Sequence, residues 1–122
     1  MAQSPLTLVL GASENPNRYS HRAANMLKSH GHAVWLTGRR PGNHDGMPIC
    51  THFPEQGIVD TVTLYVGPAH QAEFASAVEK LLPRRIIFNP GTENPKWQAH
   101  LQGLGIVVEE ACTLVLLSIG QY

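Results

Sequence analysis

The sequence predicts an α/β fold built on an open parallel sheet of about five strands, with helices packed on both faces of the sheet. Three observations support this prediction. Short apolar runs of strand length alternate with segments whose apolar residues recur at helical spacing. The connections between these segments are short. The first run, Leu6 to Leu10, is almost wholly apolar, as expected of a parallel strand that is covered on both faces.

The first two strands and the first helix come from the N-terminal third of the chain. Leu6 to Leu10 ends at Gly11, where a glycine lets the backbone turn sharply. A helix follows, capped by Asn17 or an adjacent residue and ended by Gly31. Its apolar residues at helical spacing are Tyr19, Ala23, Met26 and Leu27. Ala33 to Thr37 is then predicted to form the second strand.

The middle of the chain contains a long connection and the third strand. Gly38 to Gly46 is rich in glycine, proline and asparagine, which predicts turns, and Met47 to Thr51 is predicted to form a minor edge strand. Asp60 to Val66 is the third strand. The helix that follows ends at Pro83, because proline cannot continue a helix. Its apolar residues are Phe74, Ala75, Val78, Leu81 and Leu82.

The last third repeats the alternation of strand and helix. Arg85 to Phe88 is the fourth strand, and Asn89 to Glu93 is a tight loop. Asn94 caps a helix with proline at its first position, which extends to about Leu104. The final elements are a short strand at Ile106 to Val108 and an apolar helix at Cys112 to Ile119. Strands that alternate with helices in this way predict a Rossmann-like sheet with right-handed crossovers.

Composition limits the possible functions. The 122 residues predict a single domain, residues 1–122, and nine basic residues balance nine acidic ones. A neutral chain has no general attraction for nucleic acid. No apolar run approaches the ~20 residues of a membrane span, so no membrane partner is expected. Two cysteines, Cys50 and Cys112, are too few for a disulfide framework, and the absence of a leader segment adds to the expectation of a cytoplasmic protein.

The predicted binding site lies where the carboxyl ends of the strands meet. In open α/β sheets, ligands bind at this edge, where the strand order reverses. A helix that starts just after a glycine-containing loop also points free N–H groups at an anion. Arg18, at the start of that helix, is unfavourable to the helix dipole unless a bound anion offsets its charge. The loops expected at this edge contain Gly11, Ala12, Ser13, Thr37, Gly38, Arg39, Arg40, Gly67, Pro68, Asn89 and Gly91.

The chain resembles the small stand-alone coenzyme A-binding proteins, whose fold is similar to the nucleotide-binding domain of succinyl-CoA synthetase alpha subunits. The residues that carry the resemblance are Val9 to Ser13, Asn15 to Ser20, Gly31 to Val34, Val59 to Val66, Gly91 with Glu93 and Asn94, and Glu110 to Leu114. The resemblance implies that coenzyme A or an acyl-CoA is the ligand. It implies that Gly11, Ala12 and Ser13 contact the diphosphate, Arg18 and Tyr19 close over it, and Gly67 and Pro68 border the nucleotide.

Two segments depart from this family. Thr37 to Arg40 stands where the family often has Val-Asn-Pro, and Asn89 to Gly91 stands where Gln-x-Gly is frequent. Arg39 and Arg40 follow the second strand, where an NAD-binding domain would have an acidic residue. An arginine there suits a phosphate, such as the 3′-phosphate of coenzyme A.

No set of nucleophile, base and orienting group can be assembled, so we expect a non-catalytic binding module or sensor. The alternative is a small NAD(P)- or acyl-CoA-dependent enzyme, or a subunit of one, with Arg39 and Arg40 on a 2′-phosphate and Cys112 or His21 supplying chemistry. A third possibility is a domain that has lost its ligand site and serves association. Edge strands and the apolar last helix make a homodimer or a protein partner possible.

A metal site is not expected from sequence. The best cluster of possible ligands is His44, Cys50 and His52, and its spacing matches no closed zinc pattern.

Overall fold

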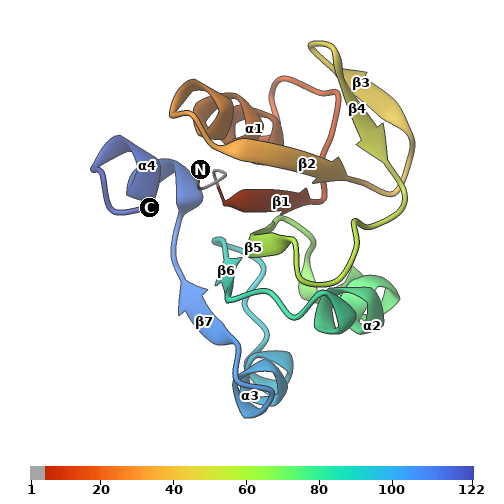
Figure 1. The fold of residues 1–122 in the computed structure, drawn as a ribbon, viewed down its shortest axis with the longest axis vertical. Helices are drawn as coiled ribbons and strands as arrows, with labels where there is room; N and C mark the ends of the chain where they lie inside the picture. Colours follow the sequence, from red (N-terminus) through yellow and green to blue (C-terminus); the bar gives the residue numbers. More distant parts are fainter. Residues whose placement is uncertain (1–4) are drawn as a thin grey trace.

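The computed structural model describes residues 5–122, which form one seven-stranded sheet flanked by helices (Figure 1). The strand order is β3-β4-β2-β1-β5-β6-β7, and only β3 runs antiparallel to its neighbour. Among the described residues, no helix is long and apolar enough to cross a membrane. The strands are β1 Leu6–Leu10, β2 Ala33–Thr37, β3 Gly42–His44, β4 Met47–Cys50, β5 Val59–Leu64, β6 Arg85–Phe88 and β7 Val107–Glu110. The helices are α1 Tyr19–Ser29, the 3-10 turn η1 Pro68–His70, α2 Ala72–Leu81, α3 Pro95–Gly103 and α4 Thr113–Ser118.

Strand β1 lies in the middle of the sheet and sets the alignment of the others. Leu10, its last residue, pairs with Thr37 at the end of β2 and with Leu64 at the end of β5. In turn, Leu64 pairs with Phe88, the last residue of β6. The chain leaves β1 for β2 on one side and returns to pair β5 on the other, so the strand order reverses at β1. The loops that follow these strands therefore meet at one edge.

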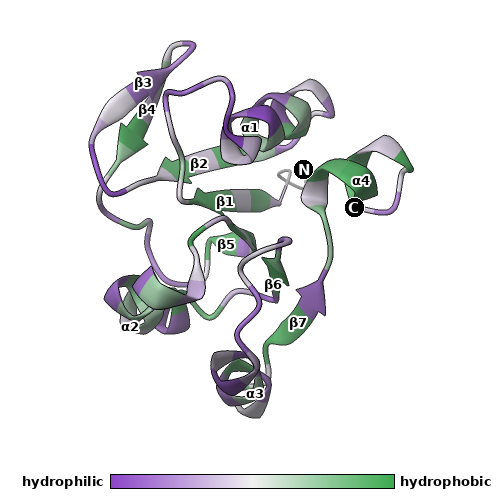
Figure 2. Cartoon of the chain, turned by 180° about the vertical axis from the view of Figure 1, so that it is seen from behind, coloured by the Kyte–Doolittle hydropathy of each residue, from purple (hydrophilic) through white to green (hydrophobic). Residues whose placement is uncertain are grey.

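Two apolar clusters cover the two faces of the sheet. Helices α1 and α4 lie on one face, where Val9, Ala24, Leu27, Leu36 and Leu117 are buried together. Helices α2 and α3 lie on the other face, where the buried set includes Leu8, Phe74, Val78, Phe88 and Leu101. Figure 2 shows hydrophobic colour along the strands between these two helical layers. The neighbouring residues Leu8 and Val9 face opposite layers, as the alternation of a strand requires.

The predicted Rossmann-like class is confirmed, but the estimate of about five strands was too low. Strand β4 corresponds to the predicted minor edge strand, whereas β3 lies within the segment predicted to be turns only and forms a hairpin with β4. Asp45 and Gly46 connect these two strands with φ angles of 49° and 90°. Two positive φ values in a two-residue connection are typical of a type I′ turn. The third predicted strand also ends earlier than expected, at Leu64 rather than Val66.

The helix ends follow the predictions in part. Asn94 caps α3 through its side chain, which accepts a hydrogen bond from the Trp97 N–H. Gly31, with φ of 83°, follows the end of α1 as expected. The cap of α1 was predicted at Asn17 or an adjacent residue; the N-cap position is the adjacent Arg18, but no side chain among residues 5–122 makes a capping hydrogen bond there. Asn17 instead donates its N–H to Asn15 Oδ1 in the preceding turn.

Candidate functional site

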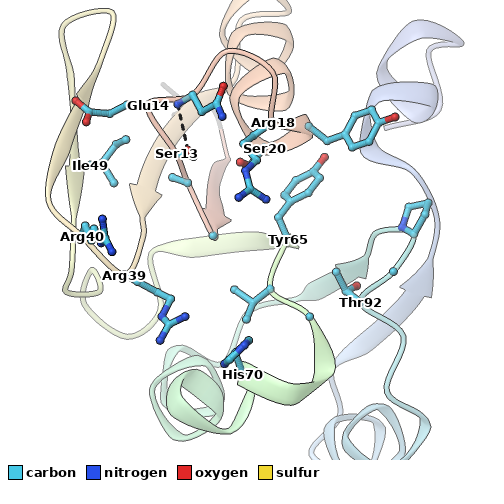
Figure 3. A pocket seen from close by; sticks show the side chains of 18 of the residues that line it. Ser13, Glu14, Arg18, Ser20, Arg39, Arg40, Ile49, Tyr65, His70 and Thr92 are labelled. Carbon is cyan, nitrogen blue, oxygen red and sulfur yellow. Dashed lines mark hydrogen bonds between the residues drawn. The ribbon is translucent and has the colours of Figure 1, made fainter.

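A cleft of about 960 Å³ opens at the carboxyl edge of the sheet (Figure 3). Its lining comes from the loops after β1, β2, β5 and β6, from the first turn of α1, and from β4. This is the edge at which the strand order reverses, so the predicted location of the site agrees with the location of the cleft. The lining residues are Gly11, Ala12, Ser13, Glu14, Asn15, Arg18, Tyr19, Ser20, Arg39, Arg40, Pro41, Ile49, Tyr65, Val66, Gly67, His70, Pro90, Gly91 and Thr92.

The loop after β1 is held in place by its own backbone. Gly11 has φ of 97°, and a Cβ there would lie 3.0 Å from the carbonyl group of Tyr65. Both Gly11 and Ala12 donate their N–H groups to the Thr37 carbonyl oxygen, at 2.9 and 3.0 Å. These two amides therefore fix the loop against β2 rather than facing a ligand. Gly11 and Ala12 can border a diphosphate, but its hydrogen-bond donors have to come from elsewhere.

The N-terminus of α1 is the best source of such donors. The first N–H groups of a helix have no carbonyl partner within the helix, and in the part of the chain that the structure describes no side chain caps those of α1. Tyr19 and Ser20, the first two helical residues, both line the cleft. The helix dipole adds partial positive charge at the same place. An uncapped helix start that faces a cleft is suited to binding an anion.

Three arginines add positive charge around the cleft. Arg18 stands at the start of α1, and Arg39 and Arg40 follow β2; all three side chains are exposed. Arg39 Nη2 lies 3.5 Å from Glu73 Oε1, on helix α2 across the rim of the cleft. His70 Nδ1 lies 4.0 Å from the same carboxylate oxygen, and Figure 3 shows Arg39 and His70 near one another. In the described structure, Glu73 is thus shared by two groups that line the cleft.

The floor of the cleft includes Tyr65. Its Oη is buried and has no hydrogen-bond partner among residues 5–122. Burial raises the pKa of Tyr65 to about 12, since the phenolate would lose its hydration. The side chain is therefore neutral at physiological pH and offers a flat ring rather than a charge.

A buried polar chain fixes the loops after β5 and β6 on the opposite side. Gln71 donates from Nε2 to the carbonyl oxygens of Val66 and Thr92, at 2.9 and 2.7 Å. Its Oε1 accepts a hydrogen bond from Asn94 Nδ2. Val66 and Thr92 line the cleft, so one buried amide side chain sets the distance between two of its walls.

Most of the predicted site residues line the cleft together. These are Gly11, Ala12, Ser13, Arg18, Tyr19, Arg39, Arg40, Gly67 and Gly91. Four others lie outside the lining: Thr37, Gly38, Pro68 and Asn89. Pro68 begins the turn η1 directly after Gly67. Gly38 is buried against the loop after β1, where a Cβ would lie 2.6 Å from the Ala12 carbonyl oxygen.

Thr37 and Asn89 are buried behind the cleft lining, and their side chains form hydrogen bonds within the protein. Thr37 Oγ1 donates to the His52 carbonyl oxygen and accepts from Trp35 Nε1. Asn89 is 1% exposed, and its Nδ2 donates to Thr63 Oγ1 and to the Leu64 carbonyl oxygen. Its Oδ1 accepts from the N–H of Thr113, which begins α4. All the polar atoms of the Asn89 side chain are thus engaged within the protein.

The cleft also contains residues that were not singled out from sequence. Glu14 accepts a hydrogen bond from the Asn43 N–H at 2.9 Å, which ties the loop after β1 to the β3–β4 hairpin. Ile49 from β4 and Pro41 also contribute to the lining, as do Tyr65 and Val66. Tyr65 and Val66 could have been found, because they end the predicted third strand. Ile49 could not, since its inclusion depends on how the hairpin packs.

The two side chains weighed as alternative catalytic groups do not line the cleft. Neither Cys112 nor His21 is among its lining residues. His21 instead packs against His44, with the ring centroids 3.8 Å apart.

Trp97, in helix α3, also lies away from the cleft. It packs edge-on against Phe88 and donates its Nε1–H to Glu79, so it belongs to the core on the α2 and α3 face.

A family model and several solved structures match the chain. The family model described as "CoA binding domain" matches residues 6–118. A crystal structure of an uncharacterized protein shares 43% sequence identity, with a TM-score of 0.93, and the match covers 99% of this chain and 100% of that one. No curated protein matches the chain.

More distant structures share the fold. A protein from Thermus thermophilus is 21% identical, with a TM-score of 0.83 over 98% of this chain and 91% of its own. A hypothetical protein from Pyrococcus horikoshii is 19% identical, with a TM-score of 0.80 over 89% of this chain and 78% of its own. At these identities the likeness concerns the fold alone.

Proposed function

Since the chain belongs to the CoA-binding domain family, we propose that it binds coenzyme A or an acyl-CoA through the diphosphate, as a non-catalytic module or sensor. The observation that carries this proposal is the uncapped start of α1, which faces a cleft bordered by Arg18. Free helix amides and a guanidinium are the donors that a diphosphate requires.

The size and lining of the cleft support a ligand larger than a simple anion. A volume of about 960 Å³ is at the upper end of the range for small-molecule pockets. Apolar surface from Ile49, Tyr65 and Val66 lies beside the charged groups. We propose that the diphosphate binds at the α1 end and that the less polar parts of the coenzyme lie against this surface.

Arg39 and Arg40 supply a second positive region of the cleft. Coenzyme A has a 3′-phosphate on its ribose in addition to the diphosphate, and arginine binds such a group through two parallel hydrogen bonds. We assign the 3′-phosphate to this pair of residues. Arg39 would then exchange its contact with Glu73 for one with the ligand.

The side chains that line the cleft are those that a binding role requires. Among the described residues that line the cleft there is no cysteine, and Ser13 Oγ accepts a hydrogen bond from the Asn15 N–H without a histidine beside it. Within residues 5–122, the one carboxylate within 4.0 Å of the His70 ring is that of Glu73, at the rim of the cleft. Both cysteines are free thiols, which suits the reducing cytoplasm where we place this activity.

Isothermal titration calorimetry with four ligands tests the proposal. We expect coenzyme A to bind with the highest affinity, dephospho-coenzyme A to bind more weakly, and NADH and NADPH to give little heat. The loss between the first two ligands measures the 3′-phosphate contact. Tight binding of NADPH with no heat from coenzyme A would instead favour the alternative of an NADP-dependent enzyme. No binding of any of the four would favour a domain that serves association only.

A further inference from the structure

A group of side chains that could bind a metal ion lies outside the cleft, between helix α1 and the β3–β4 hairpin. It contains His21 from α1, His44 at the end of β3 and Asp45 in the hairpin turn. Each residue offers one possible ligand atom, and these three atoms lie within 4.8 Å of one another. None of the three residues lines the cleft, so the group is separate from the proposed coenzyme site.

His44 is buried among polar groups from α1 and the hairpin turn. His44 is 2% exposed, and its Nε2 lies 2.7 Å from Asn25 Oδ1 and 3.8 Å from Asp45 Oδ2. The hydrogen bond to Asn25 satisfies one nitrogen of a buried imidazole. His21 takes no part in this hydrogen bond. The centroid of its ring lies 3.8 Å from that of the His44 ring, at an interplanar angle of 34°.

Two elements of secondary structure bring these side chains together. His21 and Asn25 are four residues apart on α1, so they lie on the same side of the helix. Asp45 adopts φ of 49°, a left-handed conformation that aspartate tolerates better than most residues, and the tight turn keeps it beside His44. Two imidazoles, a carboxylate and an amide oxygen thus converge from a helix and a hairpin.

Metal coordination would change the hydrogen bond between His44 and Asn25. A metal ion requires an unprotonated imidazole nitrogen as its ligand. Coordination through Nε2 would move the ring proton to Nδ1, and Asn25 Oδ1 would change from a hydrogen-bond acceptor to a possible ligand.

We propose that His21, His44 and Asp45 form a binding site for a divalent transition-metal ion of the zinc class. Imidazole and carboxylate are common zinc ligands, at about 2.0–2.2 Å from the ion. Ligand atoms around a tetrahedral zinc ion are therefore about 3.3 Å apart. The present group needs to contract only modestly to reach this spacing, and Asp45, which is exposed, is free to move. Asn25 Oδ1 or a water molecule would complete the coordination.

This assignment differs from the His44, Cys50 and His52 cluster considered from sequence. Of those residues only His44 belongs to the group that the structure brings together. His52 instead packs edge-on against Trp35 at 5.7 Å. The two sets share one ligand, so variants at the residues they do not share can distinguish them.

Zinc titration of the tag-free, EDTA-treated protein tests the proposal. Calorimetry with Zn²⁺ gives stoichiometry and affinity, and the visible absorption of Co²⁺ reports its coordination number. His21→Ala and Asp45→Asn each remove one proposed ligand, and His52→Ala is the matched control. We expect one ion per wild-type chain, a loss of roughly tenfold or more in affinity for the first two variants, and wild-type affinity for His52→Ala.

Three results would overturn the proposal. They are no uptake of Zn²⁺ by the wild-type chain, wild-type affinity in both His21→Ala and Asp45→Asn, or an equal loss in His52→Ala. Circular dichroism of each variant establishes that it is folded. If His21→Ala does not fold, Asp45→Asn decides the question, since this side chain is exposed and asparagine tolerates the same turn conformation.

Discussion

Gly38 and Ala12 are in direct contact, because a Cβ added to Gly38 would lie 2.6 Å from the Ala12 carbonyl oxygen. Gly38 also donates its N–H to the Cys50 carbonyl oxygen at 2.8 Å. The residue after β2 is therefore fixed on both sides, by the loop after β1 and by β4. It determines the shape of the cleft without lining it.

Replacing Gly38 by alanine should lower the free energy of unfolding by about 1–3 kcal/mol, as for other additions to a packed interior. Gly103→Ala is a matched control, since a Cβ at Gly103 has no atom within 4 Å. That control should be neutral or stabilising by about 0.5–1 kcal/mol, because alanine favours the helix. Urea unfolding of both variants measures the difference. Equal stabilities would mean that the Ala12 loop moves aside at no cost.

Replacing Arg18 by alanine should weaken the proposed binding of coenzyme A by about 1–3 kcal/mol, because the proposed charge-assisted contact with the diphosphate would be lost. Lys80→Ala is the control, because this substitution removes one positive charge from the last turn of α2, and Lys80 does not line the cleft. Calorimetric titration measures both affinities. Unchanged binding in Arg18→Ala would remove this residue from the site.

Replacing Glu73 by glutamine should strengthen the binding of coenzyme A by about two- to fivefold, because Arg39 is freed from an exposed ion pair. The variant also removes a negative charge from the rim. Glu79→Gln, on the same helix, removes an equal charge away from the cleft. The effect should diminish with dephospho-coenzyme A if Arg39 contacts the 3′-phosphate. An equal gain in Glu79→Gln would indicate a general charge effect instead.

Asp60 should make folding stability depend on pH in the acid range. Arg84 donates to both oxygens of Asp60, at 2.9 and 3.0 Å, and these hydrogen bonds lower the pKa of the carboxyl group below its usual value. The unfolded chain therefore takes up the proton at higher pH than the folded chain. The stabilisation that the ionised Asp60 contributes is complete above the pKa of its carboxyl group in the unfolded chain, about 3.9. It is lost as the pH falls through the lower pKa of that group in the folded chain.

Asp60→Asn should accordingly be less stable than the wild type at pH 7, and the difference should narrow as the pH falls below about 4. Urea unfolding at several pH values measures both curves. Glu55→Gln, at an exposed position, is the control and should run parallel to the wild type. A constant difference between Asp60→Asn and the wild type at all pH values would rule out titration of Asp60 as the cause.

Much of the fold could be predicted because its strands are apolar and its helices have a clear period. β1 and β6 are buried along nearly their whole length, which their composition indicates. β3 was missed because Gly42, Asn43 and His44 carry no apolar alternation. Its structure depends on pairing with β4 and on the contact of Asn43 with Glu14. The Asp45-Gly46 pair was the available signal, since this dipeptide favours a two-residue hairpin.

The site could be predicted at the level of loops but not of individual atoms. The strand ends identify which loops meet, because parallel strands align their carboxyl ends. They do not tell which residues turn inward, and Thr37 and Asn89 prove to be bonded within the protein. Nor could the sequence indicate that the amides of Gly11 and Ala12 are already used by Thr37.

The pairing of β1 with β5 also bears on how the protein folds. It aligns Leu10 with Leu64, so the two walls of the cleft come from segments far apart along the chain. Closing so long a loop is entropically costly and slows the formation of non-local sheet contacts. During synthesis, the segment with β1, α1 and β2 emerges well before β5. We therefore expect a nascent chain to bind the proposed coenzyme only after β5 has emerged and paired with β1.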